Sequence, residues 1–328
     1  MNYLSLSFIL LLAVTLLLFY LWPKKYIKYR YFLFLIASYV FISFYDFRFG
    51  LVVLANTLVS YFCGLFTYGY TKEKANEFID TEELLTNIEE LIYIENTSIV
   101  KEKVKDKVKG KEIRRTWVLV LSIVLNIGFL FLVKYFNWFG GIFSSLLKKP
   151  FSAISFIVPL GLSFYIFTLV AYNVDVWRKK FPAERNFFKF AAFVSFFPKL
   201  AEGPIVSYDE IGGDGLFNNK TFEDIDLLKH FQRIILGVLK KVLIADILGV
   251  YVSYIWANFR DVPGVYFPLV AILYAIQLYC DFSGFMDMSI GIAGLFGVEL
   301  PENFNAPYLS KTVQEFWNRW HISLGKWL

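Results

Sequence analysis

The sequence predicts an all-α protein that crosses a membrane several times. Of its 328 residues, 57% are hydrophobic and 20% are aromatic, and the mean hydropathy is +0.52, which is more apolar than a soluble domain. The apolar residues also gather in long runs, and a helix of roughly 20 such residues crosses a hydrocarbon layer about 30 Å thick. Eight runs are expected to span the membrane: Leu4–Trp22, Tyr31–Phe49, Leu51–Tyr70, Thr116–Trp138, Phe151–Trp177, Val242–Asn258, Val265–Tyr279 and Phe285–Leu300.

The first run is expected to stay in the protein, because no basic residue precedes it and no small-residue cleavage pattern follows it. Basic residues then orient the spans, since loops rich in lysine and arginine stay in the cytoplasm. This rule places the N-terminus, the tight turn Asp46–Gly50 and the segment around Lys148 and Lys149 outside. We expect a multi-pass protein of the cell (inner, cytoplasmic) membrane, whose cytoplasmic loops contain Lys24, Lys25, Lys28, Arg30, Arg114, Arg115, Arg178, Lys179, Lys180 and Arg185.

A charged segment divides the chain into three predicted regions. Residues 1–70 hold N-terminal membrane helices, residues 71–115 form a cytoplasmic insertion, and residues 116–328 form the membrane core. The insertion is first acidic and then rich in lysine, and it is either simply solvated or in contact with the membrane surface through its lysine-rich half. An amphipathic helix is expected from the spacing of Leu84, Leu85, Ile88, Leu91, Ile92 and Ile94.

Charge and cysteine content argue against other classes of protein. The formal charge of +5 follows from the basic cytoplasmic loops, so it indicates no nucleic-acid site. Cys63 and Cys280 both lie in apolar runs and resemble neither a disulfide framework nor a metal site. The sequence therefore predicts no metal and no bound cofactor.

The segment FFPKLAEGPI, residues 196–205, interrupts an apolar run that is too short to span a membrane. Pro198, Gly203 and Pro204 break the helical backbone there, and a broken backbone at membrane depth survives only against protein or a water-filled cavity. We expect a re-entrant segment that lines a site. A simple interfacial loop is the alternative, because proline and glycine also punctuate ordinary loops.

Three polar residues lie where the last two expected spans adjoin. Asp281, Ser283 and Asp287 are close enough to occupy one helix end and the following turn. A charge at membrane depth costs ~2.5 to 3.5 kcal/mol on insertion scales, so these carboxylates need partners. Asp287 is expected to cap the helix or to pair with Arg319 or a lysine, whereas Asp281 could instead help to shape a cavity.

One of only two histidines stands in the final stretch, QEFWNRWHISLGKWL. Residues 311–328 have helical spacing, and His321 is expected on the edge of the apolar face of that helix. Burial disfavours the charged imidazole, so a buried His321 would be neutral at pH 7 and able to accept a proton from a hydroxyl or water. It is either such a general base or a core histidine bonded to a neighbouring carbonyl.

Several motifs occur in the order seen in one family. They are PLGLSFYIFTLVAYNVDVWR (159–178), FFPKLAEGPI (196–205), GVLKKVLIAD (237–246), QLYCDFSGFMDMSIGIAGLFG (277–297), ENFNAPYL (302–309) and EFWNRWHISLGKWL (315–328). This pattern resembles the membrane-bound O-acyltransferases (MBOAT family), in the branch of alginate O-acetylation and D-alanyl-teichoic-acid transfer proteins. The similarity covers roughly residues 110–328, and the RWHISL block is its most specific part.

The resemblance implies an MBOAT fold and a transferase that moves an acyl group, acetyl in the first instance, from a cytoplasmic thioester to hydroxyls of an exported polymer. It implies that His321 is the catalytic base in a tunnel through the protein. The matching polar or aromatic positions, assigned to the shape and support of that tunnel, are Asp281, Ser283, Asp287, Asn303, Asn305, Tyr308, Trp317, Arg319 and Ser323.

The resemblance also implies partners. The donor would be an acyl-CoA or an acyl carrier protein, the acceptor an exported polysaccharide or a teichoic-acid-like polymer, and an extracytoplasmic acyltransferase would work beside this protein among the membrane lipids. Two features depart from the family: Lys199 and Glu202 in FFPKLAEGPI, and an end directly after the histidine block, from which we expect a C-terminally truncated chain. A translocation module, a scaffold for polymer modification and an inactive fragment are the alternatives.

Overall fold

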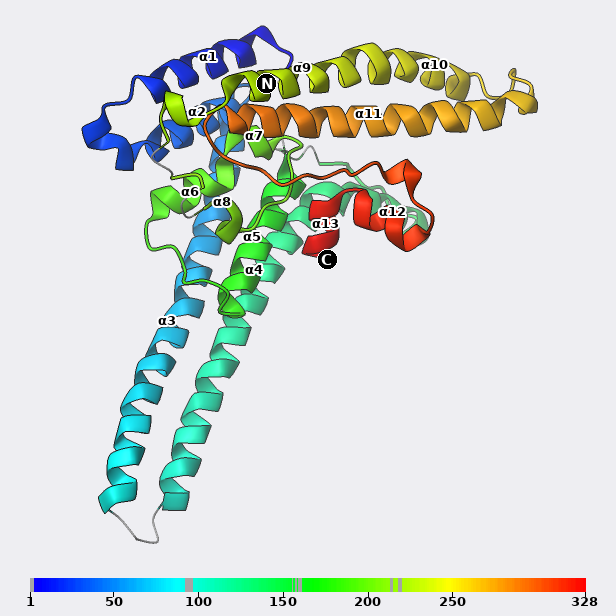
Figure 1. Cartoon of the computed structure of the whole chain (residues 1–328). Coiled ribbons are helices and arrows are strands. Elements are labelled where there is room, and N and C mark those ends of the chain that lie inside the picture. Colours follow the sequence, from blue (N-terminus) through cyan, green and yellow to red (C-terminus); the bar gives the residue numbers. More distant parts are fainter. Residues whose placement is uncertain are drawn as a thin grey trace. The chain divides into compact units, whose positions relative to one another are not determined.

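The computed structural model describes residues 3–91, 97–154, 156, 158, 161–212, 215–217 and 220–328, with the side chains of all of these except 70–108 and 111 (Figure 1). Within these ranges the regular structure is helical, as predicted, and the one β-type pairing described is an isolated antiparallel bridge between Phe304 and Trp320. The chain divides into two compact units. Unit 1 comprises Met1–Gly50, Pro159–Tyr165 and Ala191–Leu328, and unit 2 comprises Leu51–Val158 and Ile166–Phe190.

The helices follow one another along the whole chain, with short 3-10 or π-helical turns between some of them. Their bounds are α1 Leu6–Tyr20, η1 Lys24–Tyr29, α2 Tyr31–Ser43, α3 Phe47–Leu91, α4 Thr97–Leu147, α5 Leu162–Trp177, α6 Phe187–Ser195, α7 Phe197–Leu200, α8 Tyr208–Ile211, η2 Phe222–Asp224, α9 Leu227–Leu239, η3 Lys240–Ala245, α10 Asp246–Ala257, η4 Gly264–Tyr266, α11 Phe267–Gly294, η5 Pro307–Leu309, α12 Val313–Arg319 and α13 Ile322–Trp327.

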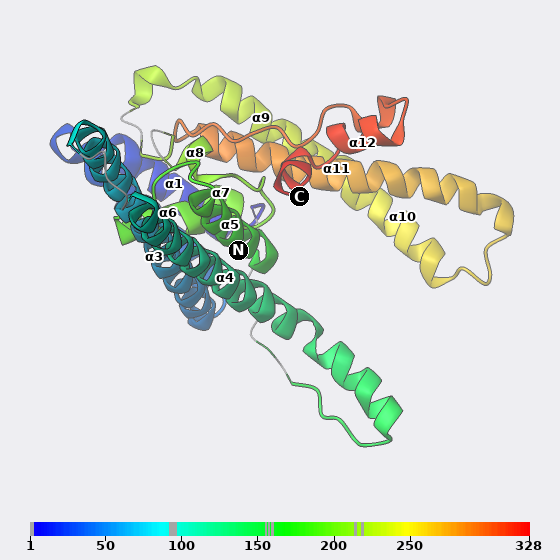
Figure 2. The same ribbon diagram turned by 90° about the horizontal axis from the view of Figure 1, so that it is seen from below.

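The centre of unit 1 is an antiparallel pair of helical rods. α9, the π-helical turn η3 and α10 follow one another without a break, and α11 returns beside them, as Figures 1 and 2 both show. The two backbones come close where glycines face each other, because a Cβ added at Gly284 would lie 2.8 Å from the carbonyl oxygen of Gly237. Small residues allow this approach, so the glycine contact sets the spacing between α9 and α11.

Aromatic rings hold α1, α2 and α7 against the residues that follow α11. Phe296 contacts Phe19, Phe34 and Phe197 edge to face, at ring-centroid distances of 5.2, 5.3 and 5.9 Å. All four rings are fully buried. Such edge-to-face contacts suit the charge distribution of aromatic rings and add to the gain from burying them. The segment that contains Pro198 is thereby fixed inside unit 1.

Unit 2 is built mainly from α3, α4 and α5. Hydrogen bonds join these largely apolar helices to one another and to the residues that follow α5. The Asn126 side chain of α4 donates to Ser60 Oγ of α3 at 2.9 Å, and both groups are buried. Tyr61 of α3 donates to the carbonyl oxygen of Arg185 at 2.5 Å, and the Arg115 guanidinium donates to the carbonyl oxygen of Trp177. Hydrogen bonds of this kind hold neighbouring helices together where the surroundings offer no water.

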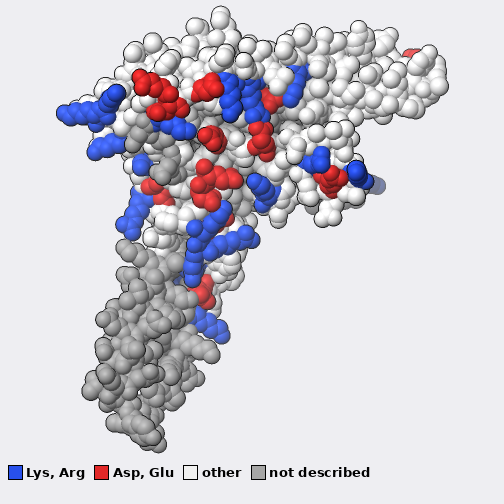
Figure 3. Space-filling model, viewed as in Figure 1, with Lys and Arg blue, Asp and Glu red and all other residues white. Residues whose placement is uncertain are grey.

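Three described helices are long and apolar enough to cross a membrane, namely Phe47–Gly69, Glu112–Leu147 and Gly264–Gly294. Shorter apolar helices are Leu6–Tyr20, Tyr31–Ser43 and Leu162–Trp177. The visible face of α10 and α11 is largely free of charged side chains (Figure 3), and exposed apolar residues such as Val250 and Ile272 cover these helices. This surface suits contact with hydrocarbon.

Several predicted boundaries were wrong. Val265–Tyr279 and Phe285–Leu300 do not form two spans, because the single helix α11, Phe267–Gly294, contains most of the first and the beginning of the second. Within Phe151–Trp177, α5 covers Leu162–Trp177 and follows Gly161, which has a φ of +70°, and the described residues before Gly161 are not helical. The expected turn Asp46–Gly50 is mostly the first turn of α3. Val242–Asn258 forms parts of η3 and α10, which are neither among the three long apolar helices nor among the three shorter ones.

The predicted insertion lies on the continuations of α3 and α4, whose backbones are helical up to Leu91 and again from Thr97. Residues 92–96, including Ile92 and Ile94, lie outside the described residues, as do the side chains of Leu84, Leu85, Ile88 and Leu91. The amphipathic face and its contact with solvent or membrane therefore stay predictions.

We predict that Gly284→Ala destabilises the protein, because the added Cβ meets the backbone of Gly237 and forces α9 and α11 apart. Gly128→Ala in α4 is the matched control, since nothing lies within 4 Å of a Cβ at that helical position. Thermal unfolding in detergent should show a lower midpoint for Gly284→Ala and an unchanged or higher one for Gly128→Ala. Equal midpoints for the two variants would contradict the role of the glycine contact.

Candidate functional site

His321 interrupts the C-terminal helix that the sequence predicted. Instead of one helix over 311–328, α12 ends at Arg319, Trp320 is extended, and α13 begins at Ile322. His321 adopts a left-handed conformation, with φ 48° and ψ 53°. For a residue other than glycine such a backbone costs ~1 to 3 kcal/mol and persists only where the surrounding structure enforces it. The continuous helix was therefore a wrong prediction, and the break falls at the candidate base.

The His321 side chain is half-buried, and its Nε2 atom is buried. Its ring packs edge to face on Phe282 of α11, with centroids 4.8 Å apart, and Nε2 is buried without a hydrogen-bond partner among the described residues. Burial lowers the pKa of His321 below its ordinary value of 6.5, so the imidazole is neutral at pH 7. Nε2 is thus available to a proton donor, and the described residues place no carbonyl on it.

Asp281, Ser283 and Asp287 all lie inside α11, and not at a helix end followed by a turn. Asp287 is buried and pairs with two cations, Lys240 at 2.6 Å and Arg233 at 3.0 Å. The predicted pairing with a lysine is confirmed. The alternative pairing with Arg319 was wrong, because Arg319 instead bonds Glu315 at 2.7 Å on its own helix.

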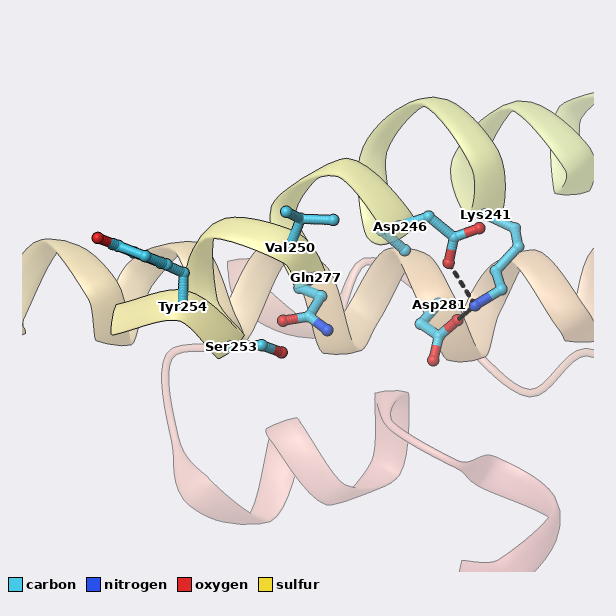
Figure 4. Close-up of a pocket in the computed structure, with 9 residues that line it drawn as sticks. Lys241, Asp246, Val250, Ser253, Tyr254, Gln277 and Asp281 are labelled. Atoms are coloured by element: carbon cyan, nitrogen blue, oxygen red, sulfur yellow. Dashed lines mark ion pairs between the residues drawn. The ribbon is translucent and has the colours of Figure 1, made fainter. Parts of the chain in front are cut away.

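A cavity of about 640 Å³, which is wide open on one side, lies beside η3, α10 and α11, and Asp281 lines it (Figure 4). Lys241 Nζ lies 2.7 Å from Asp281 and 2.7 Å from Asp246, so one ammonium group joins both carboxylates. Gln277 and Ser253 add an amide and a hydroxyl to the lining. Asp281 and Phe282 are neighbours in α11, so this polar cavity and the His321 ring occupy adjacent faces of one helical turn.

The segment FFPKLAEGPI is broken and buried, as predicted. α7 is a single turn, after which Gly203 and Pro204 have no regular secondary structure and are buried. The Pro198 carbonyl oxygen accepts from Tyr3 Oη at 2.7 Å and from Ser289 Oγ at 2.5 Å. Burial inside unit 1 favours a re-entrant segment over an exposed loop, and its depth in the membrane stays a prediction.

This segment also contacts the helix that follows His321. Ile205 N donates to Ser323 Oγ at 3.1 Å, and Ser323 is buried. Lys199 is buried too, with its ammonium 4.1 Å from the centre of the Phe193 ring, and burial lowers the pKa of this lysine to about 7. The segment 196–205 is thus hydrogen-bonded to α13, the helix that follows His321.

The other predicted residues divide into two groups. Asn303 and Ser323 are buried beside His321, and Ser283 is buried in α11. Asn305, Tyr308 and Trp317 are exposed in the described structure, although Tyr308 Oη donates to the carbonyl oxygen of Ala275 at 2.7 Å. The structure therefore brings only part of the predicted set together around His321.

Sequence reasoning missed several residues of the site, namely Arg233, Lys240, Lys241, Asp246, Gln277, Phe282 and Glu302. A signal for three of them was present, because Lys240, Lys241 and Asp246 are the charged residues of GVLKKVLIAD. Charged residues beside an apolar run point to partners at the same depth. Arg233 and Phe282 carry no such local signal.

Comparison with known proteins adds to this geometry. The profile described as MBOAT, membrane-bound O-acyltransferase family, matches residues 34–328. A probable alginate O-acetylase of Pseudomonas putida is 39% identical over 214 residues, which are 64% of this chain and 44% of that protein. A peptidoglycan O-acetyltransferase of Helicobacter pylori is 30% identical, over 66% of this chain and 45% of that protein. A teichoic acid D-alanyltransferase of Bacillus subtilis is 28% identical, over 54% and 45%. The chain thus spans about half the length of these relatives.

We predict that Asp287→Ala lowers the free energy of unfolding by ~3 kcal/mol or more, because it leaves two partly buried cations without their shared carboxylate. Asp46→Ala is the control, since Asp46 lies at an exposed site, where it pairs with Arg48 and accepts from Arg48 N, so its loss should cost much less than that of Asp287. Unfolding by denaturant in detergent micelles measures both. A loss for Asp287→Ala no larger than for Asp46→Ala would show that the buried ion cluster does not hold α9 to α11.

Proposed function

The chain belongs to the membrane-bound O-acyltransferase family, and on that premise we propose that it transfers an acyl group to hydroxyls of an exported polysaccharide or cell-wall polymer, with His321 as the general base. The observation that carries this proposal is the state of the imidazole. Its Nε2 is buried, has no hydrogen-bond partner among the described residues, and belongs to a ring whose pKa is lowered by burial. These are the properties that a base needs to take a proton from a neutral hydroxyl.

The proposed reaction is a transfer from sulfur to oxygen. His321 Nε2 accepts the proton of an acceptor hydroxyl while the oxygen attacks the thioester carbonyl carbon. The C–O bond forms, the C–S bond breaks, and the thiolate leaves. The proton held on Nε2 then passes to the thiolate, so that the products are an ester and a free thiol. Base assistance of this kind contributes typically ~10² to 10⁴ in rate.

The acyl group and its donor follow from two lines of support. Acetylases are named among the relatives in Pseudomonas putida and Helicobacter pylori, so acetyl is the first choice and D-alanyl the second. The donor would be an acyl-CoA or an acyl carrier protein that approaches from the cytoplasm. The cytoplasmic side is the one on which we expect the basic loop with Lys24 and Arg30. No bound cofactor is needed for this transfer.

The acceptor would approach from the opposite side. The relatives' names include alginate, peptidoglycan and teichoic acid, which supports a polymer as acceptor. We further propose that the protein lies in the cytoplasmic membrane and works with an extracytoplasmic acyltransferase. If the acyl group passes through the protein, neither the thioester nor the polymer needs to cross the membrane intact.

We predict that His321→Ala lowers polymer acylation by ~10² to 10⁴. The assay supplies membrane vesicles that contain the chain with labelled acetyl-CoA, or labelled acetyl carrier protein, and with alginate or teichoic acid, and measures ester-bound label. His230→Gln is the matched control, because the chain's other histidine packs against Gly294 in the contact between α9 and α11. Acylation that persists in His321→Ala would favour a translocation or scaffold role, and a wild-type chain that acylates none of these polymers would contradict the proposed activity.

The same assay has a predictable pH dependence. Neutral imidazole is the active form, and burial places the pKa of His321 below 6.5. The rate should therefore be independent of pH from 7 to 8 and should fall by about tenfold per pH unit once the pH drops below that pKa. A rate that rises on acidification would show that the protonated imidazole, and not the base, is the active form.

A further inference from the structure

The two peptide N–H groups that follow His321 bond to a single residue of a distant loop. Ile322 N donates to the carbonyl oxygen of Asn303 at 3.0 Å, and Ser323 N donates to Asn303 Oδ1 at 2.8 Å. These are the first donors of α13, which a residue at the helix start would ordinarily satisfy with its own side chain. His321 stands at that start and makes no such bond, so Asn303 caps the helix from outside it.

The Asn303 side chain is itself held in place. It is 1% exposed, and its Nδ2 lies 3.2 Å from Met286 Sδ on α11. The amide therefore lies between α11 and α13, with its oxygen on the backbone of α13 and its nitrogen on a side chain of α11. Because the Asn303 side chain contacts both helices, the position of α13 relative to α11 depends on it.

The residues before His321 are fixed by the same loop. Phe304 forms the isolated antiparallel bridge with Trp320, and Asn305 N donates to the carbonyl oxygen of Arg319 at 2.9 Å. The backbone is thus bonded to the loop on both sides of His321. A left-handed residue held in this way cannot relax to the helical conformation without breaking these bonds.

The loop has an outer anchor at Glu302. Its carboxylate accepts two hydrogen bonds from Arg233, both at 2.5 Å, and Arg233 also bonds Asp287 of α11. A forked pair of this kind fixes direction as well as distance. The loop is consequently attached to α9 and α11 on one side and to the backbone around His321 on the other.

We propose that Asn303 is a positioning residue, which holds the left-handed backbone of His321 so that Nε2 stays in its enclosed place against Phe282. The catalytic meaning of this role depends on the proposed function. Asn303 touches no reacting atom in this account and acts only through His321. Loss of its side chain lets the start of α13 relax and moves the imidazole toward water.

Kinetics give the first test, in the vesicle assay with labelled acetyl donor and polymer. Asn303→Ala should lower kcat by about 10- to 100-fold with KM for donor and acceptor unchanged, whereas Asn303→Asp, which keeps an oxygen acceptor for Ser323 N, should restore most of it. Asn318→Ala is the matched control, an exposed asparagine three residues before His321. Wild-type kcat in Asn303→Ala, or a loss that appears only in KM, would overturn the proposal.

Histidine NMR gives a test that needs no activity. In a His230→Gln background His321 is the only histidine, so ring-labelled protein in detergent reports its pKa directly. The pKa should rise toward 6.5 in Asn303→Ala and stay low in Asn318→Ala. If Asn303→Ala does not fold, Asn303→Gln, which displaces the amide by one methylene, takes its place in both tests.

The two tests separate the two proposals. A pKa that moves in Asn303→Ala while even the wild-type chain transfers no acyl group leaves the positioning role standing and the proposed function contradicted. An unchanged pKa in Asn303→Ala or Asn303→Gln overturns the positioning role, whatever the activity.

Discussion

A carboxylate inside an apolar helix needs partners, and the partners of Asp287 organise unit 1. Its cost at that depth is offset only when cations and hydrogen bonds surround it. Arg233 and Lys240 supply both from α9 and from the first residue of η3. Gly237 and Gly284 let the two backbones approach closely, so the distance between the helices is short enough for both cationic side chains to contact Asp287. Charge and close approach thus specify the same pairing of α9 with α11.

The consequences of this pairing extend in two directions along α11. On one side Lys241, the neighbour of Lys240, turns to Asp281 and Asp246 at the polar cavity. A π-helical turn widens the helix at these two lysines, and such turns are frequent at functional sites. On the other side Arg233 binds Glu302. The next residue, Asn303, accepts a hydrogen bond from the backbone that follows His321. The cavity and the candidate base therefore share one rigid support.

The sequence predicted those parts of the structure whose cause is local. Apolar runs located the long helices, Pro198, Gly203 and Pro204 located a broken and buried segment, and a membrane-depth carboxylate implied a lysine partner at Asp287. It failed where the cause is distant along the chain. α11 looked like two elements because Asp281, Gly284 and Asp287 interrupt its apolar pattern, yet their partners lie on α9 and η3, some 40 to 50 residues earlier. No pattern within 277–297 could show that.

The conformation of His321 was hidden for a related reason. The spacing of Phe316, Trp320 and Leu324 favours a continuous helix, and neither glycine nor proline marks a break. The break is imposed by hydrogen bonds from residues 303–305, which satisfy the backbone that a helix would have satisfied by itself. A buried nitrogen that has no partner in the described part of the chain and a left-handed backbone both oppose stability, so the surrounding structure must enforce both. Both occur at one histidine, and a separate loop bonds the chain on either side of it, which supports the general-base role proposed for His321.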